Sequence, residues 1–297
     1  MKQFFLWFRI IRPQTLFASL CPVLVGLLVA SHHVGSFNWR GHLTAFFTIL
    51  CSLALQILSN LINDYYDYKR GTDKKGRVGF KRALAEGTVN ENQMRMACII
   101  TLSIALVLGL ILCQIGGWPI FLIGLTAILF AWLYTATPYS LSYLGIADIF
   151  VFLYYGVIAS WGTEWLQYKV ADLPFNFKQL TSVYAGAVCG LISMCVLAIN
   201  NIRDIDDDRL VGKRTIPVRF GKKYALLLFG IIVVLMPLFA WLAFGINWTL
   251  GIIIPASFLY YKVLRAHGTA YNRCLLMAGI VNLIYLLLVY ISILLFV

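Results

Sequence analysis

Seven of the twelve acidic residues of the chain are concentrated in two short windows. The seven are Asp64, Asp67, Asp73, Asp204, Asp206, Asp207 and Asp208. On a helix, Asn63 and Asp67 would share one face, because residues four apart are neighbours. In the second window Asn200, Asp204 and Asp208 would form a line with the same spacing. Like charges at this spacing repel each other, so two such arrays call for a cation.

Carboxylate and amide oxygens are hard ligands, and these arrays fit Mg²⁺ best. This ion commonly bridges one or two carboxylates to the phosphates of a substrate and keeps several waters. Basic residues follow each array and could hold diphosphate oxygens: Lys74, Arg77, Lys81, Arg82, Lys213 and Arg214. The sequence has no P-loop or dinucleotide-binding glycine pattern, which disfavours a nucleotide diphosphate.

The segments that must position these arrays are strongly apolar, and their lengths predict membrane-spanning helices. Of the 297 residues, 61% are hydrophobic and only 12% are charged, whereas about a quarter are charged in soluble domains. No Asp, Glu, Lys or Arg occurs in the runs 13–33, 41–63, 96–147, 224–261 and 274–297. A helix needs about 20 apolar residues to cross the hydrocarbon core, and the longest runs divide at the turn-forming segments 116–119 and 245–248. We therefore expect nine spans, near residues 13–32, 42–66, 94–114, 118–136, 146–166, 180–202, 223–244, 248–264 and 275–297.

The net charge of +12 comes from basic residues that gather on one side of this arrangement. With the N-terminus in the cytoplasm, the cytoplasmic segments hold all of the 24 lysines and arginines except Arg40, Lys169 and Lys178. This is the positive-inside bias, and nine spans then place the C-terminus outside. The charge thus indicates orientation in a lipid bilayer, and we expect no nucleic-acid partner. We expect an integral membrane protein with its site facing the cytoplasm. The membrane we expect is the cytoplasmic membrane of a bacterium, while the charge pattern itself suits an organelle membrane equally.

The predicted architecture is a single all-α membrane domain over residues 1–297. Two long cytoplasmic connections, about 67–93 and 203–222, carry the acidic arrays and cap the site. The spans before them run in the same direction, which hints at an internal duplication with both arrays facing one cavity. The simpler interpretation is that the acids only neutralise basic loops at the lipid headgroups. For Asp206 and Asp207, exposure to water is as good an interpretation as metal binding.

Several motifs of the chain resemble those of the UbiA superfamily of intramembrane prenyltransferases. The two acidic motifs are Asn63-Asp64-x-x-Asp67 with Asp73, and Asp204-x-x-x-Asp208 followed by Gly212-Lys213-x-Thr215. Further matches are Arg12-Pro13-x-Thr15-Leu16, the run 69–74, and the stretch 134–167 with its segment Tyr143-Leu144-Gly145-Ile146-Ala147-Asp148. These are similar to the dihydroxynaphthoate polyprenyltransferase branch in particular. Gly71 stands where the commonest first motif of the superfamily has a third aspartate; Asp73 takes that place here, as in the menaquinone branch.

The resemblance implies a fold and a reaction. The fold is nine helices around a central cavity, with a lateral opening for a prenyl chain. Mg²⁺ and a polyprenyl diphosphate would be bound by aspartates and basic residues of the motifs: Asn63, Asp64, Asp67, Asp73, Asp204 and Asp208 for the metal, and Lys74, Arg77, Arg82 and Lys213 for the diphosphate. Ionisation of the allylic C–O bond would let the ring of 1,4-dihydroxy-2-naphthoate attack at its carboxylate-bearing carbon. Loss of CO₂ would then give demethylmenaquinol.

Single residues near the cytoplasmic edge have two interpretations each. Tyr134 is a candidate for stabilising the carbocation with its aromatic face, or it is an interfacial anchor. Asp148 is a candidate catalytic group that contacts a ring hydroxyl, or a charge that suits a helix N-terminus. Arg12 and Asn200 are candidates for binding the aromatic acceptor, although positive-inside anchoring also explains Arg12. Together with Asp67 and Asp208, Tyr134 and Asp148 form the predicted catalytic set.

Other functions remain as alternatives. The acceptor could be a different ring, such as 4-hydroxybenzoate or homogentisate. A cation-coupled transporter could also use aspartates, but transporter sites usually lie near the bilayer midplane, whereas both arrays here lie at helix ends. The histidines His32, His33 and His42 fall on the far side, so a histidine metal site is not expected. Glu164 also lies near that face, and no role is assigned to it.

Overall fold

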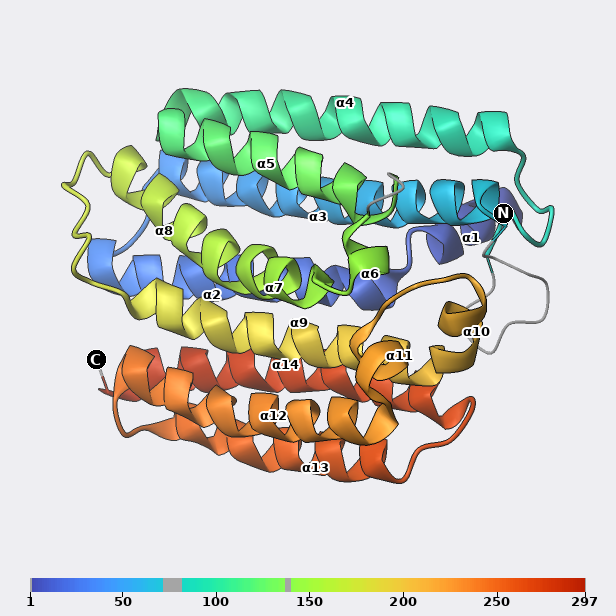
Figure 1. The fold of residues 1–297 in the computed structure, drawn as a ribbon. Coiled ribbons are helices and arrows are strands. Elements are labelled where there is room, and N and C mark those ends of the chain that lie inside the picture. Colours follow the sequence, from blue (N-terminus) through green and yellow to red (C-terminus); the bar gives the residue numbers. More distant parts are fainter. Residues whose placement is uncertain (1, 72–81, 137–139, 297) are drawn as a thin grey trace.

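The computed structural model describes residues 2–71, 82–136 and 140–296, which form an all-helical bundle (Figure 1). Eight helical stretches in this part of the chain are long and apolar enough to cross a membrane: α2 (Pro13–Val34), α3 (Trp39–Lys69), α4 (Glu91–Gly116), α5 (Trp118–Thr135), the continuous stretch Ala147–Val170, α9 (Thr181–Arg203), α12 (Lys222–Phe244) and α14 (Ala270–Phe296). A shorter apolar helix, Trp248–Leu264, consists of the 3₁₀ turn η2 (Trp248–Ile252) and α13 (Ile253–Leu264). The nine predicted segments are therefore confirmed.

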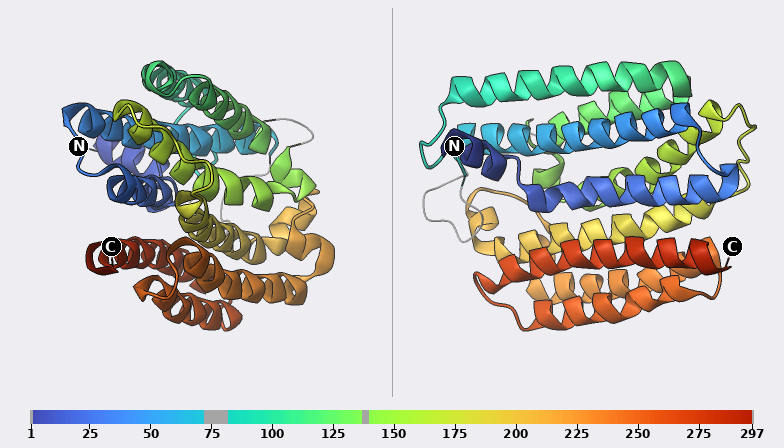
Figure 2. Two further views of the ribbon diagram at one scale, coloured as in Figure 1. Left: turned by 90° about the vertical axis from the view of Figure 1, so that its left-hand side faces the viewer. Right: turned by 180° about the vertical axis from the view of Figure 1, so that it is seen from behind.

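The long helices run side by side, and the two ends of the bundle differ (Figures 1 and 2). One end, here called the cap end, carries α1 (Lys2–Ile10), α6 (Leu141–Leu144), α10 (Ile205–Leu210) and α11 (Ile216–Phe220). The other end carries connections between helices, such as 171–180, and is called the opposite end. The N-terminus lies at the cap end and the C-terminus at the opposite end (Figure 1).

Helix α9 forms the centre of the packed core. Its buried side chains pack with those of α2, α12, α13 and α14 in one hydrophobic cluster. By contrast, α4 and α5 expose most of their length, and only 11% of each apolar window is buried. In water such surfaces would be an aggregation liability, whereas lipid is as apolar as their leucines. The exposed faces therefore fit a protein that is surrounded by lipid.

The fifth span is broken, although the sequence predicts one regular helix over 146–166. The stretch consists of α7 (Ala147–Phe152), a π-helical turn η1 (Leu153–Val157) and α8 (Ile158–Val170), with Tyr155 at φ −94°, ψ 19°. At η1 the backbone lies so close to α9 that a Cβ on Gly156 would be 2.6 Å from the carbonyl oxygen of Gly186. Gly186 and Gly190 form a G-x-x-x-G pattern, which allows such close helix contact.

Candidate active site

A cavity of about 440 Å³ lies between α2, α3, α5, α8 and α9. It extends along α3 from Asp67, near the cap end, to Thr48, deep in the bundle. Its charged lining residues are Arg12, Asp67, Arg82, Asp148, Arg203, Asp204, Asp208 and Lys213. The rest of the lining is largely apolar or small, with Leu55, Leu112 and Ile120 among its members. The cavity therefore has a charged end and a remainder in which apolar surface predominates over polar groups such as Thr48, Gln56 and Asn282.

The first acidic array comes from the last turns of α3. Asp67 is 2% exposed and lines the cavity, as does Asn63. Asn63 is held from two sides: its Nδ2 donates to Thr135 Oγ1 at 3.0 Å, and its Oδ1 accepts from Arg82 Nη2 at 3.2 Å. The amide oxygen of Asn63 is thereby fixed at the cavity wall, one helical turn from Asp67.

Asp64 has a different position from Asp67. It is only 3% exposed and is not among the residues that line the cavity. Its Oδ1 accepts hydrogen bonds from both Arg12 and Arg82, which do line the cavity. The structure therefore places Asp64 behind two arginines, as their shared counter-ion, and its predicted role as a metal ligand stays a prediction.

The second array lies at the junction of α9 and α10. The predicted helical line from Asn200 through Asp208 is interrupted, because α9 ends at Arg203 and Asp204 has φ −98°, ψ 16°. The Asp208 N–H still donates to the Asp204 carbonyl oxygen at 2.8 Å, which keeps the two carboxylates at the same cavity. Each is 7% exposed.

The partners of the two carboxylates differ. Arg203 binds both oxygens of Asp204, with Nε and Nη2 at 2.7 and 2.8 Å, and its Nη1 donates to Asn272 of α14 at 2.8 Å. Lys213 Nζ lies 3.5 Å from Asp208 Oδ1. Bidentate binding by a guanidinium is a strong and rigid arrangement, so Arg203 holds Asp204 firmly within the protein.

Tyr134 lies where the arrays meet. It lines the cavity from α5, and the charges of Asp67, Asp148 and Asp208 are close enough to act on its hydroxyl. Asp148, in the first turn of α7, also lines the cavity. The predicted catalytic residues thus come from α3, α5, α7 and α10 and lie around one space.

Other predicted residues have mixed positions. Asn200 lines the cavity, and its Nδ2 donates to the Val196 carbonyl oxygen at 3.1 Å. Asp206 and Asp207 are exposed, so water and not the cavity surrounds them. Asp73, Lys74, Arg77 and Lys81 lie outside the described residues.

Two cavity residues were missed by the sequence analysis. Arg203 precedes the second array, and its bidentate pair with Asp204 and its contact with Asn272 separate it from an ordinary interfacial arginine. Tyr155 lines the cavity from the π turn. The sequence signal for this residue was Gly156 and the G-x-x-x-G pattern of α9, which allow the two helices to approach closely. A π turn forms at this contact, and π turns often mark functional sites.

The donor set fits Mg²⁺. In the described part of the chain, no three His, Cys, Asp or Glu side chains come together as a ready-made metal site. Mg²⁺ does not require one, since it usually takes one or two carboxylates and completes its shell with water and substrate phosphates. Asp67, Asp208 and the amide oxygen of Asn63 offer this kind of oxygen set on two walls of one cavity.

Comparisons with known proteins agree with this arrangement. The sequence profile of the UbiA prenyltransferase family matches residues 19–284. The 1,4-dihydroxy-2-naphthoate octaprenyltransferase of Escherichia coli is 33% identical over 243 residues, covering 77% of this chain and 74% of that protein. The enzyme of the same name from Bacillus subtilis is 30% identical over 253 residues, covering 85% and 74%.

Solved structures show the same fold. A UbiA homolog from Aeropyrum pernix aligns with a TM-score of 0.65 and 16% identity, covering 95% of this chain and 98% of that one. A UbiA homolog from Archaeoglobus fulgidus, solved bound to GPP and Mg²⁺, aligns with a TM-score of 0.62 and 17% identity over 96% and 98%. The profile match covers most of the chain, and the fold agrees over almost its full length. The chain therefore belongs to the UbiA prenyltransferase family, and it is a membrane-embedded enzyme.

Proposed function

We propose that this enzyme transfers a polyprenyl chain from polyprenyl diphosphate to 1,4-dihydroxy-2-naphthoate, with loss of CO₂, to give demethylmenaquinol. The observation that carries the proposal is that Asp67 of α3 and Asp208 of α10 line one cavity whose remainder is largely apolar. The charged end suits a metal-bound diphosphate, and the apolar part suits a hydrocarbon chain. The names of the relatives from Escherichia coli and Bacillus subtilis support the choice of acceptor.

Asn63, Asp67 and Asp208 hold Mg²⁺ in this proposal, with Asp204 and Asp73 completing the acidic set. The bound ion would supply positive charge that stabilises the leaving diphosphate. Arg82 and Lys213, which line the same end of the cavity, add hydrogen bonds to the diphosphate oxygens. Lys74 and Arg77 remain proposed for the same task.

The rest of the reaction takes place beside Tyr134. As the allylic C–O bond breaks, its electron pair leaves with the diphosphate, and the aromatic face of Tyr134 stabilises the positive charge on the carbon. The carboxylate-bearing carbon of the acceptor forms the new C–C bond. The carboxylate then leaves as CO₂, and its bonding electrons restore the aromatic ring. Arg12, Asn200 and Asp148 bind the acceptor in this scheme.

The site faces the cytoplasm of a bacterium in this proposal. The cap end carries the described parts of the two long basic connections (Figure 1), and basic residues concentrate on the cytoplasmic side of membrane proteins. Labelling of single cysteines introduced at Asp206 and Lys178, at opposite ends of the chain's spans, would test the orientation in intact cells. A membrane-impermeant reagent should label the Lys178 position and not the Asp206 position.

The acceptor is tested with the purified enzyme, magnesium, a labelled polyprenyl diphosphate and a panel of aromatic acceptors. We expect labelled product and stoichiometric CO₂ with 1,4-dihydroxy-2-naphthoate and none without magnesium. Prenylation of 4-hydroxybenzoate or homogentisate in place of the naphthoate would reject the proposed acceptor and keep the chemistry. Cation flux in proteoliposomes without prenyl transfer would reject both.

A further inference from the structure

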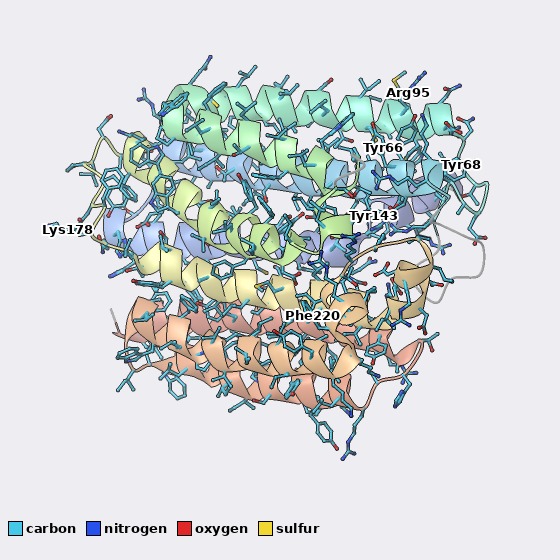
Figure 3. All side chains as sticks on the ribbon, viewed as in Figure 1. Tyr66, Tyr68, Arg95, Tyr143, Lys178 and Phe220 are labelled. Atoms are coloured by element: carbon cyan, nitrogen blue, oxygen red, sulfur yellow. The ribbon has the colours of Figure 1, made fainter. Side chains whose placement is uncertain are left out.

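Residues 140–146, the described part of the segment between α5 and α7, contact both of the helix ends that carry acidic arrays. Tyr143 belongs to α6 and lies at the cap end (Figure 3). It is not among the residues that line the cavity, whereas its neighbours Ser142 and Gly145 are. Its ring is therefore placed to act on other residues of the site and not on a bound substrate.

The end of α3 reaches this ring through Arg70. The guanidinium carbon of Arg70 lies over the Tyr143 ring, 4.8 Å from its centroid. Arg70 Nη1 also donates to Ser140 Oγ at 3.3 Å, so two residues of the same segment hold this side chain. Arg70 follows Asp67 by less than one helical turn, and a fixed Arg70 restrains the position of Asp67.

The second array reaches the same ring through Lys213. Its Nζ lies over the Tyr143 ring at 5.6 Å from the centroid and is 3.5 Å from Asp208 Oδ1. Backbone contacts hold the two segments together: the Arg214 N–H donates to the Tyr143 carbonyl oxygen at 2.9 Å. Gly145 permits this approach, because it has φ +72° and a Cβ there would lie 2.1 Å from the Arg214 carbonyl oxygen.

Two cations at one aromatic ring repel each other, and the negative face of the ring offsets part of that repulsion. We propose that Tyr143 is a positioning residue that holds Arg70 and Lys213 together and thereby fixes the first acidic array relative to the second. The ligand that benefits is the diphosphate of the donor, so this inference rests on the proposed function. The aromatic acceptor gains nothing from Tyr143 directly.

The test compares Tyr143→Leu with Tyr143→Phe. Loss of the ring should raise KM for polyprenyl diphosphate about tenfold, with little change in kcat or in KM for the aromatic acceptor. Phenylalanine keeps the ring face and should restore KM to within about twofold of the wild type. The Kd of inorganic diphosphate, measured by titration calorimetry with magnesium, should weaken with Tyr143→Leu by the same factor.

The matched control is Tyr68→Leu. Tyr68 is 37% exposed at the same end of the bundle (Figure 3), and its replacement should leave KM and the melting temperature unchanged. A second variant, Arg70→Met, keeps the test valid if Tyr143→Leu does not fold. It should raise the same KM. The double variant should raise KM no further than the more affected single variant, because both substitutions remove the contact between Arg70 and the Tyr143 ring.

Three results would overturn the inference: an unchanged KM in Tyr143→Leu, equal damage by phenylalanine and leucine, or an equal rise in the Tyr68 control. The diphosphate titration separates this inference from the proposed function. If the wild type prenylates no naphthoate but Tyr143→Leu still weakens diphosphate binding, the proposed acceptor is wrong and the role of Tyr143 stands.

Discussion

The two ends of the bundle both bury acidic side chains, but they do so in different ways. At the opposite end, Glu164 is 1% exposed and accepts hydrogen bonds from His33 Nδ1, at 2.6 Å, and from Ser182. Gln179 Nε2 lies 2.6 Å from His33 Nε2. This network assigns the proton of His33 to Nδ1. None of these four residues is among those that line the cavity.

At the cap end, by contrast, the carboxylates surround a space. Asp67 and Asp208 come from different helices, and each lines the cavity. A buried polar network whose members satisfy each other adds rigidity and a unique packing. Charged groups gathered around a cavity can instead bind a ligand. Burial of an acidic residue alone therefore does not indicate function, whereas its position relative to a cavity does.

The largest expected effect is the loss of turnover in Asp67→Ala or Asp208→Ala. Each removes an oxygen ligand proposed for Mg²⁺, so kcat should fall on the order of 10³-fold. Membrane insertion and melting temperature should stay close to those of the wild type. The control is Asp206→Ala, whose side chain is 89% exposed and which should keep full activity. Activity near the wild-type level in either cavity variant would show that the metal assignment is wrong.

The next effect concerns the opposite end and should appear in stability. Glu164→Ala leaves the buried Nδ1–H of His33 without its acceptor, and an unsatisfied buried polar group costs about 1–3 kcal/mol. Thermal unfolding in detergent should show a lower melting temperature, while kcat per folded molecule stays unchanged. A large fall in kcat without loss of stability would contradict this structural role, because it would give the opposite end a part in the reaction.

Asp64→Asn tests whether a buried carboxylate behind the cavity wall at the cap end matters less than one that lines the cavity. Asp64 is the shared counter-ion of Arg12 and Arg82, so its replacement changes residues that line the cavity without removing one. Loss of such an outer-shell partner typically costs about 10- to 100-fold, and we expect kcat/KM to fall in that range. The measurement is steady-state kinetics over a range of magnesium concentrations. A loss as complete as that of Asp67→Ala would mean that Asp64 binds the metal itself.

The sequence predicts the spans well because few structures satisfy backbone groups in lipid. A charge-free run of about 20 residues must form a helix there, and the breaks near Gly117 and Gly245 are encoded by local turn chemistry. The two arrays were also visible, since paired acidic clusters beside apolar runs are unusual. Their assignment to metal stays a prediction.

Features that depend on tertiary contact were not predictable in the same way. The π turn at Tyr155 arises where α9 allows its backbone to approach. The bidentate pair of Arg203 with Asp204 depends on a turn at the end of α9. The same arginine donates to Asn272, which lies 69 residues further along the chain. The arginines that enclose Asp64 come from 52 residues before it and 18 residues after it. No local pattern brings such groups together.

The smallest expected effect is on donor chain length, and it concerns the apolar part of the cavity, which extends from the charged end into the bundle. Gly124 of α5 lines it, and a Cβ added there would meet no atom within 4 Å. Gly124→Leu should therefore fill part of the cavity without disturbing the helix. Each methylene in an apolar pocket changes discrimination by about 1–3 kcal/mol. We expect kcat/KM for a long polyprenyl diphosphate to fall at least about fivefold relative to a short one.

The control is Leu125→Phe, since Leu125 is 52% exposed on the outer surface of the same helix. Equal loss for short and long donors would mean that the prenyl chain leaves the charged end by another route.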